Sequence, residues 1–180
     1  MIEVERKYRI SNIQDYVKSI ARLDAQELGT TTQKDQVYLP SSVGSFREYT
    51  KGTPIIRIRT EDNSITLTLK AGGEAHFTRE VETIVSDAEA TSQIIEALSM
   101  HEVMEIDKTR TTYQCEGFTV ALDRVVHLGD FLEVELLVET ESEVPDAIKS
   151  IDLFAKQKLG LSTESIENER YDTLLEHTKS

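Results

Sequence analysis

The sequence predicts an α+β fold in which helices cover one face of an antiparallel β-sheet. Hydrophobic and polar residues alternate in eight segments of the chain, which is the period of a half-buried strand. Four other segments carry hydrophobic residues at helical spacing. Two joins between strand segments, Glu61–Asn63 and Glu116–Gly117, are short and turn-forming, so these strands are expected to pair antiparallel. Eight strands are also enough to close into a barrel.

The strand segments all show the two-residue alternation over a short run. They are Ile2–Ile10, Gln33–Leu39, Ile55–Thr60, Ser64–Lys70, His76–Ile84, Glu105–Cys115, Phe118–Val125 and Phe131–Glu139. The segment Pro40–Pro54, which contains Ser, Gly and Thr, is expected to be a long loop.

Capping residues locate the four helices. The first is expected to start at the capping box Ser11–Gln14 and to stop at Gly29. A second follows the box Ser86–Glu89, and a third runs from near Pro145 to Leu159. A short fourth helix surrounds Tyr171–Leu175.

Length and charge limit the class of protein. The chain has 180 residues with 20 Lys+Arg and 33 Asp+Glu, a net charge of −13. This length suits a single domain, residues 1–180, because no linker or repeat divides it. The acidic excess repels nucleic acid and anionic lipid, so neither is expected as a partner. No apolar run reaches the ~18 residues of a membrane span, and Cys115 is the only cysteine, so a cytoplasmic location is expected.

Alternation places charged side chains on one face of seven strands, opposite an apolar face. These residues are Glu3, Glu5 and Lys7; Arg57 and Arg59; Lys70; Glu80 and Glu82; Lys108 and Arg110; Asp123; and Glu133 and Glu135. A solvated, salt-bridged sheet surface is one explanation. The other is a shared cavity, in which the carboxylates hold a divalent cation and the cations bind a polyanion. Like charges two residues apart and the abundance of arginine favour the second explanation.

The donor types also limit the cofactor. Carboxylate oxygens without histidine or cysteine partners favour Mg²⁺ or Mn²⁺ over zinc or copper. The segment Thr50–Thr53 lacks the glycine spacing of a P-loop, and the chain has no G-x-G-x-x-G motif. A Rossmann or P-loop nucleotide site is therefore not expected.

The motif Glu3-Val4-Glu5-Arg6-Lys7 resembles the E-x-E-x-K signature of the CYTH superfamily, the triphosphate tunnel metalloenzymes. Later motifs follow in the order of that family, at Ile56–Arg59, Leu67–Lys70, Arg79–Glu82, Lys108–Arg110, Leu122–Asp123 and Leu132–Glu135. The resemblance runs from Ile2 to Leu175. It implies a closed eight-stranded antiparallel barrel, or tunnel, with helices packed outside.

The resemblance also implies a role for each charged position. Metal ligands or their close supports are Glu3, Glu5, Asp123, Glu133 and Glu135, and triphosphate ligands are Arg57, Arg59, Lys70, Lys108 and Arg110. The residues expected to act in catalysis are Glu3, Glu5, Lys7, Lys108 and Arg110. The roles of Glu80 and Glu82 stay open between metal support and orientation of the cations.

Two local features resemble the class IV adenylate cyclases within this superfamily, namely Leu128–Glu133 and Glu169–Leu175. The resemblance implies conversion of ATP into 3′,5′-cyclic AMP and pyrophosphate with Mg²⁺ or Mn²⁺. Animal thiamine triphosphatases carry a phosphate-binding lysine in their tail, but here no lysine lies between Lys158 and Lys179. Hydrolysis of inorganic or thiamine triphosphate remains an alternative, as does a non-catalytic polyphosphate- or nucleotide-binding module. The expected partner is a small-molecule triphosphate, with ATP as the first candidate. Whether the protein forms a homodimer is left open.

Overall fold

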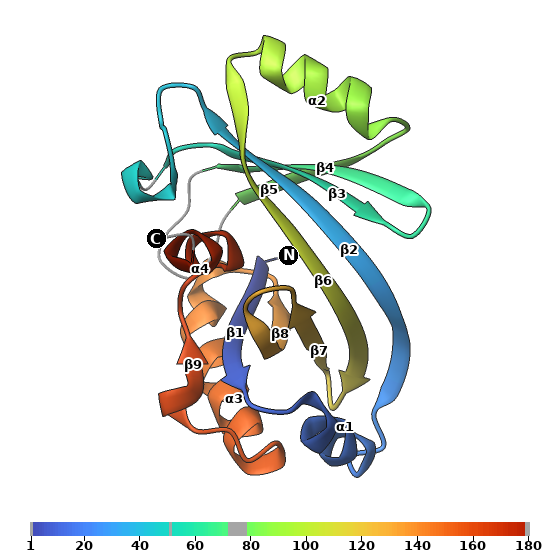
Figure 1. Cartoon of the computed structure of the whole chain (residues 1–180). Coiled ribbons are helices and arrows are strands. Elements are labelled where there is room, and N and C mark those ends of the chain that lie inside the picture. The colour runs from blue at the N-terminus through green and yellow to red at the C-terminus, as the bar shows by residue number, and fades with distance from the viewer. Residues whose placement is uncertain (1, 51, 72–78, 179–180) are drawn as a thin grey trace. The chain divides into compact units, whose positions relative to one another are not determined.

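The protein forms two compact units that share two long strands (Figure 1). The computed structural model describes residues 2–50, 52–71 and 79–178. The first unit comprises Met1–Thr30 and Thr109–Asn168, and the second comprises Thr31–Lys108 and Glu169–Ser180. Strands β2 (Gln26–Pro40) and β6 (Met100–Cys115) contribute residues to both units. The prediction that residues 1–180 make one domain stays a prediction.

Nine strands form one antiparallel sheet in the order β5-β4-β3-β2-β6-β7-β8-β1-β9. The other strands are β1 (Ile2–Ile10), β3 (Ile55–Glu61), β4 (Ser64–Ala71), β5 (Arg79–Val85), β7 (Phe118–Val125), β8 (Gly129–Val138) and β9 (Ile166–Glu167). This order is linear over the described residues, with β5 and β9 at its ends. The expected closure of eight strands into a barrel is therefore not confirmed. The ninth strand, β9, has only two residues, which is too short to show alternation in the sequence.

Several predicted boundaries are wrong. Helix α1 (Ile13–Ala21) is capped by Asn12, whose side chain accepts a hydrogen bond from the Gln14 N–H at 3.0 Å, and not by Ser11. Gly29 does not end this helix but lies within β2 at a φ of 142°, a conformation that glycine tolerates. In the expected strand His76–Ile84, residues 76–78 lie outside the described part of the chain, and β5 begins at Arg79.

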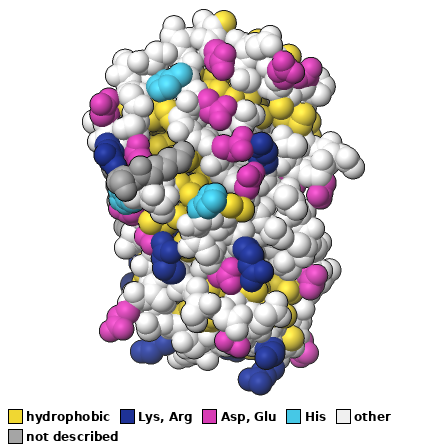
Figure 2. Space-filling view, viewed as in Figure 1, with side chains coloured by type: hydrophobic (Ala, Val, Ile, Leu, Met, Phe, Trp, Pro, Cys, Tyr) yellow, Lys and Arg dark blue, Asp and Glu magenta, His cyan; other side chains and the backbone are white. Residues whose placement is uncertain are grey.

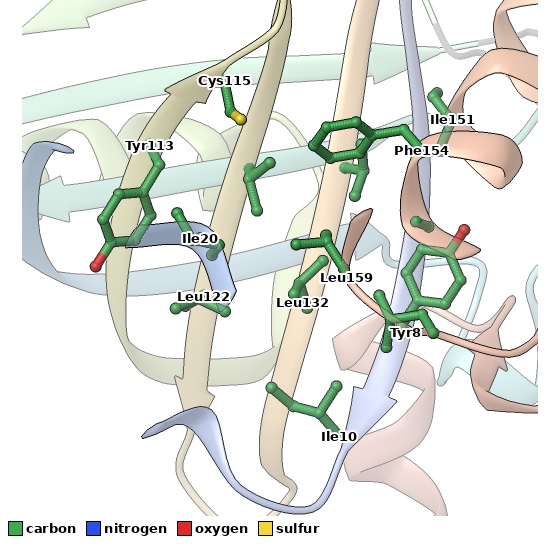
Figure 3. Close-up of a cluster of buried hydrophobic side chains, with 14 of the residues drawn as sticks. Tyr8, Ile10, Ile20, Tyr113, Cys115, Leu122, Leu132, Ile151, Phe154 and Leu159 are labelled. Carbon is green, nitrogen blue, oxygen red and sulfur yellow. The ribbon is translucent and has the colours of Figure 1, made fainter. Parts of the chain in front are cut away.

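The core of the first unit lies between the sheet and α3 (Val144–Lys158), and Figure 3 shows it in close-up. Tyr8 and Ile151 are almost fully buried there because alternation turns one side of β1 toward the apolar stripe of the helix. The rings of Phe118 and Phe154 stack with their centroids 4.4 Å apart. The same alternation directs Glu3, Glu5 and Lys7 to the other face of β1.

The second unit has a smaller core under α2 (Ala88–Ala97). Ile95 of this helix packs with Tyr38 of β2 and Ile58 of β3. Helix α4 (Tyr171–Thr178) contacts the 3₁₀ helix η1 (Phe46–Glu48), which interrupts the predicted loop Pro40–Pro54. The guanidinium of Arg170 lies over the ring of Phe46 at 5.1 Å, which ties this loop to the start of α4.

The surface carries charges of both signs. On the face drawn in Figure 2, basic side chains are dispersed among acidic ones without a continuous basic patch. No helix of the described residues is both long and apolar enough to cross a bilayer.

Replacing Phe154 with alanine should lower the free energy of unfolding by about 3–5 kcal/mol, because a stacked ring that is 5% exposed would leave a cavity. Urea denaturation followed by circular dichroism measures this loss. The neighbouring Leu153, which is 55% exposed, gives a matched control whose alanine variant should lose about 0.5 kcal/mol or less. Equal losses at the two positions would contradict the packing of α3 described above.

Candidate functional site

Carboxylates gather on the face of the first unit that lies opposite α3. The register of β1 and β8 places Glu5 opposite Glu135 and Lys7 opposite Glu133. Asp123 of β7 is fully buried, and Glu133 and Lys7 are each 8% exposed. Five charged side chains from three strands therefore lie on this face. Lys7, Asp123 and Glu133 are buried, whereas Glu135 is half-buried and Glu5 is exposed, so the mutual arrangement of the buried three has the largest energetic consequences.

Arg110 of β6 balances part of this negative charge. Its Nε and Nη2 donate to the two carboxylate oxygens of Asp123 at 2.6 and 2.5 Å, and Nη2 also donates to Glu133. A bidentate pair of this kind fixes both side chains, and loss of either partner would leave a buried charge uncompensated. The structure thus joins one predicted phosphate ligand, Arg110, to two predicted metal ligands.

Glu135 shows that negative charge is still in excess. Burial, together with Glu3, Glu5 and Glu133, raises the pKa of Glu135 to about 7, although Arg110 acts in the opposite direction. Among the described residues, no three His, Cys, Asp or Glu side chains already stand in metal-binding geometry. The donor set nevertheless fits a hard divalent cation, because clustered carboxylate oxygens are its preferred ligands and a cation would relieve their repulsion.

A separate group of cations lies on one face of the second unit. Arg59 of β3 donates from Nε and Nη2 to both oxygens of Asp35 of β2, each at 2.7 Å. Asp35 is 4% exposed, and burial alone would raise its pKa, but the hydrogen bonds and charge of Arg59 outweigh burial and lower it. Sequence analysis did not single out Asp35. The signal available in the sequence was an acidic residue inside the predicted strand Gln33–Leu39, and only strand pairing places it opposite Arg59.

Arg57 is the cation of this face whose bonding is incomplete. Its Nη2 donates to the Thr68 hydroxyl at 3.2 Å and lies 3.7 Å from a carboxylate oxygen of Glu82. Its Nε is buried and has no hydrogen-bond partner among the described residues. Burial and the nearby Arg59 both lower the pKa of Arg57. An anion with several acceptor oxygens would supply both the missing acceptor and the missing negative charge.

The remaining predicted site residues of the second unit lie near these cations or contact one another. Lys70 donates to Glu80 at 2.5 Å, and Thr68 donates to Glu82 at 2.9 Å. Glu80 and Glu82 therefore contact cations or their hydroxyl partner, an arrangement that suits an orienting role. Lys108 is 5% exposed, and its ammonium lies 5.2 Å from the centre of the Tyr171 ring.

The predicted site residues consequently fall into two sets, each described within its own unit. The carboxylate set of the first unit contains Glu3, Glu5, Lys7, Arg110, Asp123, Glu133 and Glu135. The cation set of the second unit contains Arg57, Arg59, Lys70, Glu80, Glu82 and Lys108, together with Asp35. The roles assigned to individual residues by resemblance stay predictions.

Comparison with known proteins identifies the family. The sequence profile of the CYTH domain matches residues 1–171, so the chain belongs to the CYTH family. It is 27% identical over 176 residues to adenylate cyclase CyaB of Aeromonas hydrophila, covering 98% of this chain and 90% of that protein. It is 29% identical over 174 residues to MJ0240 of Methanocaldococcus jannaschii, provisionally named an adenylate cyclase, covering 95% of this chain and 97% of that protein.

Solved structures agree with this assignment. The PH1819 protein of Pyrococcus horikoshii superposes with a TM-score of 0.81 at 27% identity, over 97% of this chain and 99% of that one. HpAC1 of Hippeastrum, described as having a dominant triphosphatase activity, superposes with a TM-score of 0.59 at 15% identity, over 91% and 92% of the two chains. At that identity, the likeness to HpAC1 shows the fold alone.

The raised pKa of Glu135 makes the stability of the metal-free protein depend on pH. The folded state binds the Glu135 proton more tightly than the unfolded state does, so stability should fall as pH rises from 4.5 to about 7. Glu135→Gln should remove that fall and be more stable than the parent at pH 8 by on the order of 1 kcal/mol, allowing for partial exposure. Urea denaturation in EDTA at pH 5 and pH 8 measures the difference.

The exposed Glu139, which follows directly after the end of β8, gives a control, because Glu139→Gln should leave the pH dependence as it is in the parent. If Glu135→Gln were no more stable than the parent at pH 8, the proposed crowding of carboxylates on β1 and β8 would be wrong.

Proposed function

We propose that this protein is a class IV-type adenylate cyclase, which converts ATP into 3′,5′-cyclic AMP and pyrophosphate with the help of a divalent cation. The observation that carries triphosphate binding is Arg57, a buried guanidinium with an unused Nε donor on a face rich in cations. The cyclase reaction within the family is supported by the names of the two curated relatives.

The cation set of the second unit is suited to bind the phosphates. Arg57 offers its free Nε donor to a phosphate oxygen, while Thr68 and Glu82 keep its guanidinium in place. Lys70 and Lys108 add ammonium charges, and burial of Lys108 strengthens its attraction for an anion. Arg59 is fixed by Asp35 and so acts as a positioned charge rather than as a mobile one. Such preorganised cations stabilise charge that develops on the departing pyrophosphate.

The carboxylate set of the first unit is suited to hold Mg²⁺ or Mn²⁺. Glu3, Glu5 and Glu135 would bind the ion, because the charges of Glu3 and Glu5 add to burial in raising the pKa of Glu135, and a cation would relieve that repulsion. A bound divalent cation would lower the pKa of the attacking hydroxyl and offset phosphate charge. Asp123 and Glu133 contribute by holding Arg110 in place.

The bonds that change are those of ATP itself. The ribose 3′-oxygen forms a bond to the α-phosphorus, and the bond from that phosphorus to the bridging oxygen breaks. Pyrophosphate and the hydroxyl proton leave, so atoms and charge balance. Electrostatic stabilisation by the fixed cations supplies most of the rate increase that this chain's residues provide.

A triphosphatase is the second candidate. The same cations and carboxylates would serve if water, instead of the ribose hydroxyl, attacked the terminal phosphorus. A neighbour of the same fold, HpAC1, is described as having a dominant triphosphatase activity, which makes this alternative specific. Its substrate would be inorganic or thiamine triphosphate.

Product analysis decides between these reactions. Purified protein should be incubated at pH 8 to 9 with Mg²⁺ or Mn²⁺ and, in parallel, with ATP, inorganic triphosphate and thiamine triphosphate. We expect cyclic AMP and pyrophosphate in equal amounts from ATP, and no turnover in EDTA. Orthophosphate without cyclic nucleotide, and faster turnover of inorganic triphosphate than of ATP, would establish the triphosphatase instead.

Arg57→Ala should lower kcat/KM by about 10²-fold, because it removes a charge-assisted contact to phosphate in a desolvated region. The same product assay, run over a range of substrate concentrations, measures it. Arg124→Ala serves as the control, because Arg124 is 62% exposed and pairs with Asp130 outside both sets. Similar losses in the two variants would show that Arg57 does not bind phosphate.

A further inference from the structure

Gln33 of β2 carries a second unsatisfied atom on the face that bears the cation set. The residue is 4% exposed, and its Oε1 is buried without a hydrogen-bond partner in the part of the chain that the structure describes. In the sheet register Gln33 lies opposite Glu61, two positions from the pair of Asp35 and Arg59. A buried acceptor that stays unpaired is costly, so its persistence in a strand calls for an explanation.

The hydrogen bond to Glu61 determines which atom of the Gln33 amide stays without a partner. Nε2 of Gln33 donates to a carboxylate oxygen of Glu61 at 3.1 Å. A carboxylate only accepts hydrogen bonds, so the amide nitrogen must face Glu61 and the amide oxygen must face away from it. The unsatisfied atom is therefore an acceptor. It needs a donor, which an ionised phosphate group does not provide.

The position of Gln33 along the strand separates it from Arg57. Arg57 lies opposite Val37, four residues from Gln33 on β2. At about 3.4 Å per residue, the two backbone positions are about 14 Å apart along the strand axis. The face thus presents a hydrogen-bond donor, Arg57 Nε, and a hydrogen-bond acceptor, Gln33 Oε1, at two separate positions along the strands. A ligand that satisfies both has phosphate oxygens at one end and a hydroxyl or amino donor at the other.

We infer that Gln33 is a specificity-determining residue whose Oε1 accepts a hydrogen bond from the organic part of a nucleoside triphosphate. The donor is either an amino group of the base or a hydroxyl of the ribose. This inference rests on the proposed function, because it takes the cation set as the phosphate-binding part. It goes further in that Gln33 distinguishes a nucleoside triphosphate from inorganic triphosphate, which has no such donor.

The test compares Gln33→Leu with Gln36→Leu. Leucine is similar in size to glutamine and removes the acceptor. Gln36 lies on the same strand but on the opposite face, and its Nε2 donates to Glu102 at 3.0 Å, so its variant loses the same kind of amide–carboxylate contact. Kinetics should be measured with ATP, 2′-deoxy-ATP and inosine triphosphate, alongside the dissociation constants of α,β-methylene-ATP and of inorganic triphosphate.

Gln33→Leu should lower kcat/KM for ATP by about 10-fold, and weaken binding of the methylene analogue to the same extent, while leaving the dissociation constant of inorganic triphosphate unchanged. Gln36→Leu should change neither. If the base amine is the donor, the parent enzyme should have a kcat/KM for inosine triphosphate that is about 10-fold lower than that for ATP. Gln33→Leu should then lower the kcat/KM for inosine triphosphate no further. If the ribose 2′-hydroxyl is the donor, the kcat/KM for 2′-deoxy-ATP should instead be about 10-fold below that for ATP in the parent enzyme, and Gln33→Leu should not lower it further.

Three outcomes would overturn the inference. If Gln33→Leu weakened binding of the methylene analogue of ATP and of inorganic triphosphate equally, Gln33 would only support the strand or bind a water molecule. An unchanged dissociation constant for the analogue would mean that Oε1 meets no ligand. Protein that binds neither ATP nor inorganic triphosphate would reject the proposed function, and this inference with it. Absence of cyclic AMP with Gln33-dependent binding of ATP would reject the cyclase reaction alone.

Discussion

The buried arginine–aspartate pair is the interaction on which the charged face of each unit depends. Asp123 with Arg110 in the first unit, and Asp35 with Arg59 in the second, join two strands through paired hydrogen bonds of 2.5 to 2.7 Å. Without such pairs, charged side chains could not be withdrawn from water at these positions, because the cost of desolvating an isolated ion exceeds most stabilising contributions of a small core.

Once these pairs are formed, each set keeps one buried or half-buried group whose charged form is disfavoured. In the first unit, burial and the neighbouring glutamates raise the pKa of Glu135. In the second unit, burial and the neighbouring Arg59 lower the pKa of Arg57. Both shifts favour the neutral form of the group. Each would be reversed by a ligand of opposite charge, a divalent cation in the first case and a polyphosphate in the second, so the shifts and the proposed ligands have a common physical origin.

The unsatisfied polar atoms select the chemical groups of a ligand, whereas charge selects only the sign of the ligand. A cluster of cations by itself does not select among polyanions, but the donor of Arg57 and the acceptor of Gln33 that are unsatisfied among the described residues require different chemical groups. Specificity arises in this way when a buried polar atom is left unpaired by the wrong ligand. The support of Arg57 by Thr68 and Glu82 serves the same end, because a fixed guanidinium loses little freedom when phosphate binds.

Sequence alone determined which residues share a strand face, because the two-residue alternation of a strand is a local property. It therefore placed Glu3 with Glu5, Arg57 with Arg59, and Glu133 with Glu135, and the ordered motifs indicated the CYTH family that the profile match confirms. The partners of these residues were decided only by the tertiary structure. Asp35 and Arg59 are 24 positions apart in the chain, and the two-residue strand β9 exists only because β1 offers it an edge. Strand pairing depends on contacts distant in sequence, which alternation within one strand does not encode.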